Sequence, residues 1–265
     1  MLNCYEFGRQ IIESRDLDPV YVVLHEAQLD RRTLQKWLLG YWCFYHMGTA
    51  SWVVDQGLYW QAMLTAAGSK DYARSSERRH FRGKSALDSV AWLKDRGVDA
   101  LFKPIWRTPQ TATQVMNYVK TWRGFGPWIA FKVADMLERL GVCDVKFSVD
   151  EAMYDSPREA AKTLWELEGQ PRAGLGDAVG GWAVNRIVDT LVNQMVGRMG
   201  HAPPRYERLI NAQEAETILC KWKSYMGGHY HVGKDIAEIK HGLERYTQCE
   251  TAQRLLQAGE KSCLW

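Results

Sequence analysis

The chain has 265 residues, of which 46% are hydrophobic and 25% charged, and its formal net charge is +3. This composition is ordinary for a globular protein, so it excludes a disordered chain, a collagen-like fibre and a coiled coil. No apolar run approaches the ~18 residues that a membrane helix needs, and the first residues lack the basic and apolar segments of a signal peptide. We therefore expect a cytoplasmic protein with no membrane partner.

The numbers of cysteines and tryptophans give further information about the kind of protein. Six cysteines lie at positions 4, 43, 143, 220, 249 and 263, and none forms a Cys-x-x-Cys pair. We therefore expect free thiols, with no structural zinc and no iron–sulfur cluster. Twelve tryptophans outnumber the seven phenylalanines. This excess indicates either a core with polar handles or surfaces on which flat rings stack.

Helical patterns recur along the chain, whereas strand patterns almost vanish. Apolar spacing and capping signals predict helices over the following ranges: 30–55, 58–67, 85–96, 109–122, 127–140, 156–169, 180–197, 212–226, 234–246 and 250–258. The only alternating stretch, Val20 to Val23, is too short to build a sheet. We predict an all-α fold, a single helical domain of residues 1–265 whose two lobes meet in the glycine-rich stretch 169–181.

Local signals set the ends of several of these helices. Gly97 is a suitable residue just past a helix end. Thr108 followed by Pro109 predicts an N-cap and a proline at the first helical position. Ser156 and Asn211 each begin a capping box that a glutamate completes three residues later.

The sharpest candidate for DNA contact lies between two predicted helices, in the segment Thr121-Trp122-Arg123-Gly124-Phe125-Gly126-Pro127-Trp128-Ile129-Ala130-Phe131-Lys132-Val133-Ala134. This is a helix-hairpin-helix pattern over about residues 109–140, hereafter the hairpin. The two glycines allow positive φ, and the unpaired N–H groups of the second helix can donate hydrogen bonds to a DNA phosphate. An αα-hairpin between two core helices fits the same pattern. The candidate DNA-binding residues are Arg123, Gly124, Phe125, Gly126, Trp128 and Lys132.

An aspartate follows the hairpin, in the segment Phe147-Ser148-Val149-Asp150. Here the chain resembles the helix-hairpin-helix DNA glycosylases, whose catalytic aspartate lies at a similar distance beyond the hairpin, in a Val-Asp context. Asp150 is the matching position. The chain lacks the lysine of the bifunctional members, with Trp128 in that neighbourhood, and lacks the cysteine cluster of others. The resemblance therefore implies their two-lobed helical fold more than glycosidic-bond chemistry, and a helix cap is the alternative role for Asp150.

Four cations and one histidine crowd the nine residues Glu77-Arg78-Arg79-His80-Phe81-Arg82-Gly83-Lys84-Ser85, hereafter the basic segment. Guanidinium groups beside the N–H donors of a helix start make a site for phosphate or diphosphate. A charge run alone is usually a solvated face, but Phe81 in its middle indicates an anchored segment. The candidate phosphate ligands are Arg78, Arg79, His80, Arg82 and Lys84.

Two further segments offer candidate substrate contacts. One places His, Tyr and Lys on a glycine-rich loop between two helices, which is typical of a binding wall, and it runs from Cys220 to Asp235. Its two histidines have no acidic or cysteine partner at metal spacing, so we expect no metal. The other runs from Tyr41 to Gly48, where the pattern favours a buried core over a binding site and a buried histidine over a catalytic one for His46. The candidate pocket residues are Trp42, His46, Lys221, Lys223, Lys234 and Asp235.

Together these segments resemble a phage family, the amino acid:DNA transferases, first described as α-glutamyl/putrescinyl thymine pyrophosphorylases. The resemblance covers roughly residues 35–245 and is carried by Trp42 to Gly48, Arg78 to Gly83, Gly124 to Met136, Cys220 to Lys223 and Gly233 to Asp235. It implies an enzyme acting on double-stranded phage DNA in which a separate kinase has phosphorylated 5-hydroxymethyluracil. The enzyme replaces that phosphate or diphosphate with an amine, such as an amino acid or putrescine, in the cytoplasm of the infected bacterium.

The residues suit that reaction, for which we expect no cofactor. A base inside a duplex must be flipped out to be reached, and a Trp or Tyr ring would hold it. The cations of the basic segment would stabilise the leaving diphosphate. An ammonium nucleophile must lose a proton, and Asp150 is the first candidate base, with His229 second. Two alternatives stay open: a monofunctional DNA glycosylase using Asp150, and a helix-hairpin-helix module that only binds DNA.

Overall fold

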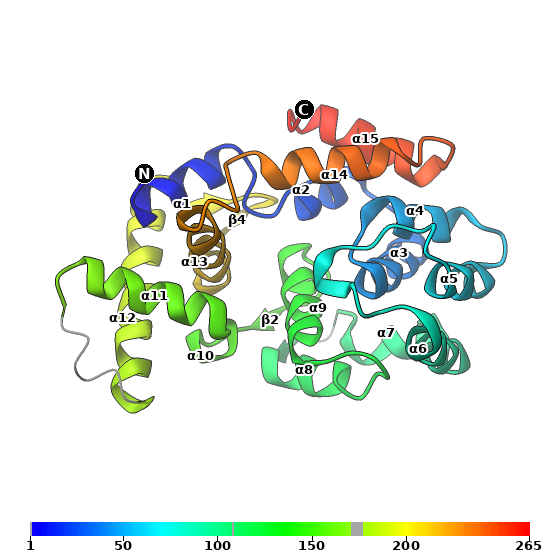
Figure 1. The fold of residues 1–265 in the computed structure, drawn as a ribbon, viewed down its shortest axis with the longest axis horizontal. Coiled ribbons are helices and arrows are strands. Elements are labelled where there is room, and N and C mark those ends of the chain that lie inside the picture. Colours follow the sequence, from blue (N-terminus) through cyan, green and yellow to red (C-terminus); the bar gives the residue numbers. More distant parts are fainter. Residues whose placement is uncertain (1, 108, 171–176) are drawn as a thin grey trace. The chain divides into compact units, whose positions relative to one another are not determined.

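A computed structural model describes residues 2–107, 109–170 and 177–265. In these ranges the chain forms fifteen α-helices, two short 3-10 turns and two small two-stranded sheets (Figure 1). The predicted all-α fold is therefore confirmed. No helix in these ranges combines the length and the apolar character needed to cross a membrane.

The chain divides into two compact units, and each is built from two separate stretches. Unit 1 comprises Met1–Pro19 and Phe147–Asp235, and unit 2 comprises Val20–Lys146 and Ile236–Trp265. Part of the stretch 169–181, where the sequence predicts a lobe junction, lies outside the described residues.

Unit 2 contains the hairpin and the basic segment. Its helices are α2 (Pro19–Ala27) apart from its first residue, α3 (Arg31–Phe44), α4 (Met47–Asp55), α5 (Tyr59–Gly68), α6 (Gly83–Arg96), α7 (Val98–Phe102), α8 (Ala112–Val119), α9 (Pro127–Arg139), most of α14 (Lys234–Glu244), and α15 (Glu250–Lys261). The 3-10 turns are η1 (Ser76–Arg78) and η2 (Lys103–Ile105). Strand β1 (Gln110–Thr111) pairs in parallel with β2 (Val145–Lys146). Gly97 ends α6 with a φ of 76°, as the sequence predicts.

An aromatic cluster forms the core of unit 2. Trp42 has no exposed surface, and its ring lies 5.6 Å from Phe102 and 6.4 Å from Trp122, measured between centroids. The Trp42 indole N–H donates to the sulfur of Met136 at 3.1 Å. Burial of side chains this large contributes roughly 2 kcal/mol each, so these tryptophans stabilise the fold rather than provide surfaces for stacking bases.

One helix predicted from the sequence is two helices in the structure. The pattern over 30–55 continues without interruption, yet Tyr45 adopts a left-handed conformation with φ of 51°. His46 then caps α4, its ring Nδ1 accepting a hydrogen bond from the third backbone N–H of that helix at 3.1 Å. Helix α4 also packs closely against α14: a Cβ atom at Gly48 would lie 2.2 Å from the carbonyl oxygen of Gly242.

Two other local predictions are wrong. Helix α8 begins after Thr111, which forms a capping box; the expected start was Thr108-Pro109, and Thr108 lies outside the described residues. Ser156 lies inside α11 (Asp155–Leu167), which has no side-chain cap. The stretch Val20 to Val23, which the sequence shows as too short for a sheet, is helical and lies within α2. In these places neighbouring capping residues and packing, rather than the short sequence patterns, determine where the helices begin.

Unit 1 is organised around α13 (Ala212–Met226), which begins with the capping box predicted at Asn211 and Glu214. Four helices contact α13: α1 (Cys4–Glu13), α10 (Val149–Ala152), α11 and α12 (Asp177–Met199) (Figure 1). Strands β3 (His201–Ala202) and β4 (Arg205–Leu209) form an antiparallel hairpin between α12 and α13. The residues of β3 and β4 show no clear alternation of apolar and polar side chains, so these strands are not predictable from the sequence.

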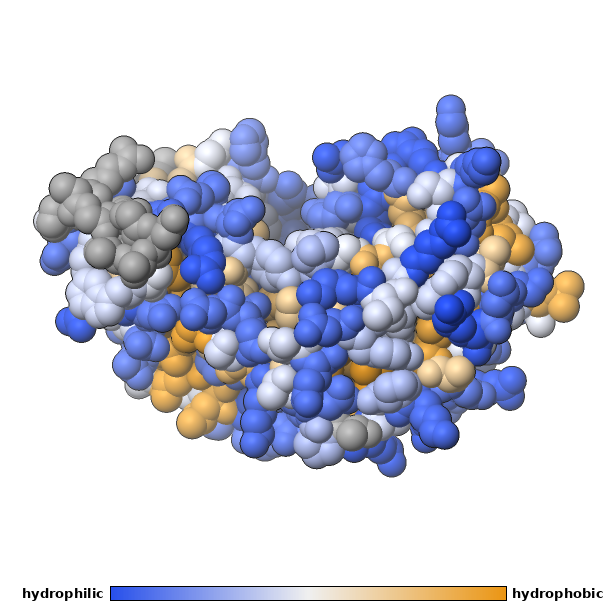
Figure 2. Space-filling view, turned by 90° about the horizontal axis from the view of Figure 1, so that it is seen from below, coloured by the Kyte–Doolittle hydropathy of each residue, from blue (hydrophilic) through white to orange (hydrophobic). Residues whose placement is uncertain are grey.

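The surface contrasts with these cores. On the face drawn in Figure 2, hydrophilic residues predominate and hydrophobic ones form small separate groups. The largest fully buried side chains are instead aromatic or aliphatic, apart from Arg139. On this face, polar groups are therefore the main features available for a functional site.

Candidate functional site

The hairpin has the geometry of a tight turn between two helices. After α8, Gly124 takes a φ of 82°, and Phe125 is buried with its ring 5.2 Å from Trp122. Gly126 is the N-cap of α9 with a φ of −86°, so only the first glycine needs positive φ. Helix α9 has no side-chain cap. The N–H groups at its exposed start can therefore donate hydrogen bonds to phosphate oxygens.

The other candidate residues of the hairpin surround this turn. Arg123 is exposed and pairs with Asp88 of α6 at 3.0 Å. Trp128 is half-buried, with its ring 5.0 Å from that of Tyr45. The ammonium of Lys132 lies 5.0 Å from the ring of the preceding phenylalanine, Phe131. The turn therefore combines polar groups with rings that hold its shape.

Arg78 ties the basic segment to the hairpin. Its Nε donates to the Cys43 carbonyl at 3.0 Å and its Nη1 to the Gly124 carbonyl at 3.2 Å. The guanidinium lies 4.4 Å from the ring centroid of Phe81 and 5.4 Å from that of Phe125. Burial lowers its pKa from the usual range. Arg78 is thus a buried anchor, and the anchoring predicted from Phe81 is present.

A pocket of about 320 Å³ lies beside this anchor, and we name it the arginine pocket. Its lining provides four cations, four hydroxyls and no carboxylate. The lining residues are Ser69, Lys70, Tyr72, Ala73, Arg74, Ser75, Ser76, Arg79 and Arg82. Such a set of donors suits a phosphate or diphosphate group.

The arginines of this pocket differ in how they are held. Arg74 donates to the carbonyls of Ala66 and Ser69, both at 2.9 Å, and also to that of Phe81. Arg79 and Arg82 are exposed, and each donates a hydrogen bond to a backbone carbonyl of its own segment, that of Ser76 and that of Arg79 respectively. Because a guanidinium has five N–H donors, both retain donors for a ligand.

The pocket therefore brings together only part of the predicted phosphate set. Arg79 and Arg82 line it, while His80 and Lys84 are exposed on the same segment and do not. The hydroxyls of the pocket and Arg74 are not among the candidates predicted from the sequence. One signal was present, because Arg74-Ser75-Ser76 runs directly into the basic segment.

Asp150 belongs to unit 1 and lies in the first turn of α10. Ser148 and Glu151 form the capping box of that helix, so Asp150 is not the cap. The Asp150 side chain is 71% exposed and lies 3.3 Å from the guanidinium of Arg158. An exposed ion pair of this kind is worth at most ~1 kcal/mol, and it leaves the carboxylate accessible.

A buried network in unit 1 holds the glycine-rich loop. Asp16 has no exposed surface and accepts hydrogen bonds from the Tyr230 hydroxyl and, at 2.7 Å, from the Gly233 N–H. Lys221 forms an ion pair of 2.6 Å with Asp235 and donates to the Asp16 carbonyl. Burial, with nearby carboxylates, raises the pKa of Tyr230. Asp16 was missed because it lies 205 residues from Lys221.

The remaining loop candidates lie outside this network. Lys234 donates to the His229 carbonyl at 2.8 Å, which fixes the loop backbone. The side chains of Lys223 and His229 are exposed. Both members of the predicted catalytic pair, Asp150 and His229, are therefore exposed side chains of unit 1.

Two predicted pocket residues belong to the core of unit 2 instead. Trp42 is fully buried, so a substrate cannot reach it in this structure. His46 serves as the cap of α4, and burial lowers its pKa to about 4, with smaller contributions from Arg245 and His241. The alternative that the segment Tyr41 to Gly48 is core therefore fits the geometry better.

Comparison with known proteins decides the family. The model of a family described as amino acid:DNA transferase matches residues 60–231. The chain is 35% identical to a glycinyltransferase of Pseudomonas phage PaMx11, over 97% of this chain and 96% of that protein. It is an amino acid:DNA transferase family member. It is also 25% identical to a putrescinyltransferase of Delftia phage PhiW-14, over 94% of this chain and 80% of that protein.

The family match bears on the candidate residues. In this transferase the matched span contains the arginine pocket, the hairpin, Asp150 and Lys221. Trp42, His46 and Asp235 lie outside it. The predicted likeness to helix-hairpin-helix glycosylases stays a prediction, supported by the geometry of the hairpin alone.

Proposed function

We propose that this transferase hypermodifies thymidine in phage DNA, replacing the phosphate or diphosphate of a phosphorylated 5-hydroxymethyluracil with an amine. The amine nitrogen forms a bond to the methylene carbon and loses a proton, while the bond from that carbon to oxygen breaks. The leaving group takes the electron pair. The arginine pocket carries the proposal, because its cations and hydroxyls match the charge that develops on a departing phosphate.

The roles of the residues follow from their exposure. Arg79 and Arg82 hold the leaving group, and Arg78 positions their segment against the hairpin turn. The hairpin binds the DNA backbone, which positions the duplex for base flipping. Asp150, the exposed carboxylate of α10, accepts the proton of the amine, with His229 second.

Glycine is the donor that we propose first. The relative at 35% identity is named a glycinyltransferase, and the one at 25% a putrescinyltransferase. A DNA kinase must supply the phosphorylated base beforehand, because the reaction consumes that phosphate. Both steps take place in the cytoplasm of the infected bacterium.

The decisive experiment is mass spectrometry of nucleosides from DNA carrying phosphorylated 5-hydroxymethyluracil, incubated with the protein and a mixture of glycine, glutamate and putrescine. We expect a deoxyuridine whose 5-methylene group carries the amine, with release of phosphate or diphosphate. Release of a free base would instead identify a glycosylase. Duplex binding with no covalent product under any condition would identify a DNA-binding module.

Two variants test the assigned roles. Arg79→Ala should lower turnover by ~10²–10³-fold, as loss of one preorganised donor does, with little change in the affinity for unmodified DNA. Arg96→Ala, at an exposed arginine of α6 outside the pocket, is the control. The defect of Asp150→Asn should shrink as pH rises and more amine is unprotonated. Full activity of Arg79→Ala, or a defect of Asp150→Asn that is independent of pH, would contradict the respective role.

A further inference from the structure

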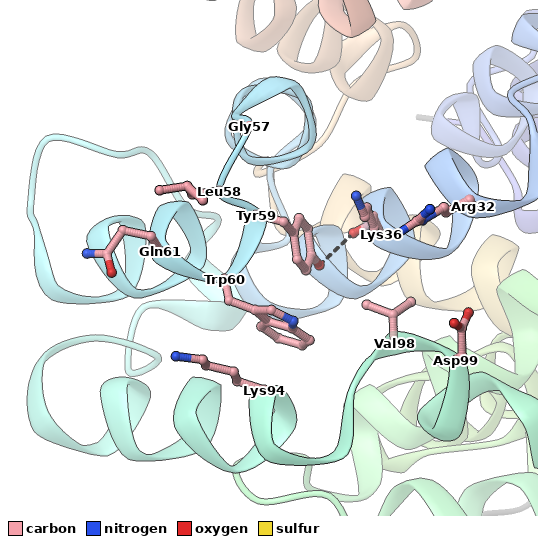
Figure 3. Close-up of a pocket in the computed structure, with 10 residues that line it drawn as sticks. All are labelled: Arg32, Lys36, Gly57, Leu58, Tyr59, Trp60, Gln61, Lys94, Val98 and Asp99. Atoms are coloured by element: carbon pink, nitrogen blue, oxygen red, sulfur yellow. Dashed lines mark hydrogen bonds between the residues drawn. The ribbon is translucent and has the colours of Figure 1, made fainter.

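A second pocket of unit 2, of about 530 Å³, shares no residue with the arginine pocket (Figure 3). Its walls come from α3, α5, α6 and α7 and the turn before α5. The lining residues are Arg32, Lys36, Gly57, Leu58, Tyr59, Trp60, Gln61, Lys94, Val98 and Asp99. We propose that this pocket binds one nucleotide unit, with the base on an aromatic ring and the phosphate among the cations.

The aromatic part of the pocket is preformed. Tyr59 is buried, and its hydroxyl donates to the Lys36 carbonyl at 3.0 Å, which fixes the start of α5 against α3. In Figure 3 the Trp60 indole projects toward the space between Lys94 and Val98. It is half-exposed, so one part of the ring stays open to a ligand. Stacking of a base on such a ring is worth ~1–3 kcal/mol.

The charge of the pocket suits a phosphate. Arg32 and Lys36 lie four residues apart on α3, so they share one face of that helix, and Lys94 of α6 lines the pocket on the other side, below Trp60 in Figure 3. With Asp99 as the only carboxylate of the lining, three cations and one anion leave a net charge of +2. A nucleotide phosphate carries up to two negative charges near pH 7.

The volume of the pocket and its position at the start of α5 agree with a nucleotide as ligand. Its volume lies within the ~300–1,000 Å³ typical of sites for small molecules. The lining includes the N-cap Leu58 and the first residues of α5, so the positive end of this helix dipole adds to the field of the cations. The nucleotide can come from free nucleotides or from a DNA strand, because both present a base beside a phosphate.

The test uses the full chain and isothermal titration with four probes: thymidine monophosphate, thymidine, inorganic phosphate and an eight-nucleotide oligothymidine. We expect the monophosphate to bind more tightly than thymidine or phosphate alone. Trp60→Ala should weaken its binding at least tenfold, Trp60→Phe only slightly, and Lys94→Glu several-fold. The controls are Trp182→Ala, at a tryptophan that is 57% exposed in unit 1, and Lys261→Ala on α15.

The probes also separate the two sources of the nucleotide. Stronger binding of the oligothymidine, lost in Trp60→Ala, would assign the pocket to a DNA strand, and equal binding would assign it to free nucleotides. The proposal is overturned if inorganic phosphate binds as tightly as the monophosphate. It is also overturned if folded Trp60→Ala and Lys94→Glu variants keep the affinity of the parent chain. The titration measures binding and not amine transfer. The nucleotide-binding proposal can therefore fail or succeed independently of the proposed function.

Discussion

The basic segment contains adjacent arginines with different tasks. Arg78 is buried and donates to two backbone carbonyls, whereas Arg79 is exposed and lines the arginine pocket. The charge run predicts a phosphate site, but it does not separate these neighbours, because they are the same residue type in the same run. The difference comes from partners 35 and 46 residues away, Cys43 and Gly124.

His46 gives a prediction for the pH dependence of stability. Burial lowers its pKa from 6.5 to about 4, with smaller contributions from Arg245 and His241. Above pH 6.5 the ring is neutral in both states, while between 6.5 and 4 only the unfolded chain gains the proton. Folding free energy of up to about 3 kcal/mol is therefore lost as pH falls through this window. His46→Asn keeps a good N-cap and removes this titration.

The measurement is the urea unfolding of both chains at several pH values from 7 to 4. We expect the stability of His46→Asn to fall less steeply than that of the parent chain. His80→Asn, at an exposed histidine of the basic segment, should keep the parent slope. Equal slopes for His46→Asn and the parent would show that His46 does not titrate in this way.

At the scale of elements, contiguous motifs were predictable and long-range packing was not. The hairpin follows from a local glycine turn between apolar helices, so its two helices and its turn appear in the sequence itself. The break between α3 and α4 has no glycine or proline at Tyr45 and His46, so no local helix-breaking residue marks the left-handed Tyr45 and the His46 cap that form it. The candidate site shows the same contrast between local motifs and long-range contacts. Asp16 could not be predicted, because it is far in sequence from the loop that it holds.

The two hairpin glycines should respond differently to substitution. A side chain at Gly124 is strained at a φ of 82°, and its Cβ would lie 2.4 Å from the Ser89 hydroxyl oxygen. Gly124→Ala should therefore destabilise the fold by about 2 kcal/mol or more. Gly126 has a φ of −86°, and no atom lies within 4 Å of the position that a Cβ would take there. Gly126→Val should cost less, about 1 kcal/mol, because it introduces no clash and only replaces the N-cap glycine of α9 with a poorer cap.

The Gly126→Val variant then isolates DNA binding. Its branched side chain stands where a phosphate would approach the backbone, so the affinity for duplex DNA should fall at moderate salt while the helical content is unchanged. Fluorescence anisotropy with a labelled duplex measures the first quantity and circular dichroism the second. An unchanged affinity in the folded variant would contradict the role of the hairpin in DNA binding.

At the scale of the whole molecule, each unit combines segments that are distant in sequence. Unit 2 needs Ile236–Trp265 in addition to Val20–Lys146, and periodicity along the chain gives no sign of this pairing. One contact shows how the distant segment is held: the N–H of Thr251 in α15 donates to Asp55 Oδ2 of α4 at 2.9 Å. The Thr251 hydroxyl donates to the same carboxylate.

Asp55 therefore caps a helix that begins 195 residues later, since the N-cap of α15, Cys249, provides no side-chain bond. Hydrogen bonds to a charged acceptor at a helix start contribute ~1–3 kcal/mol, so Asp55→Ala should destabilise unit 2 by about this amount. Thr251→Val, which removes one of the two bonds, should cost less. The double variant should cost less than the sum of the two, because both substitutions remove the same contact.

Hydrogen exchange locates the effect and tests the division into units. In Asp55→Ala the backbone amides of α4 and α15 should exchange faster, while those of α13 in unit 1 should keep their rates, because local opening follows the packed unit that is weakened. Asp95→Ala, at an exposed aspartate of α6, is the control and should change neither region. Additive costs in the double variant would mean that Asp55 and Thr251 act separately. An equal acceleration in α13 would mean that the two units open together.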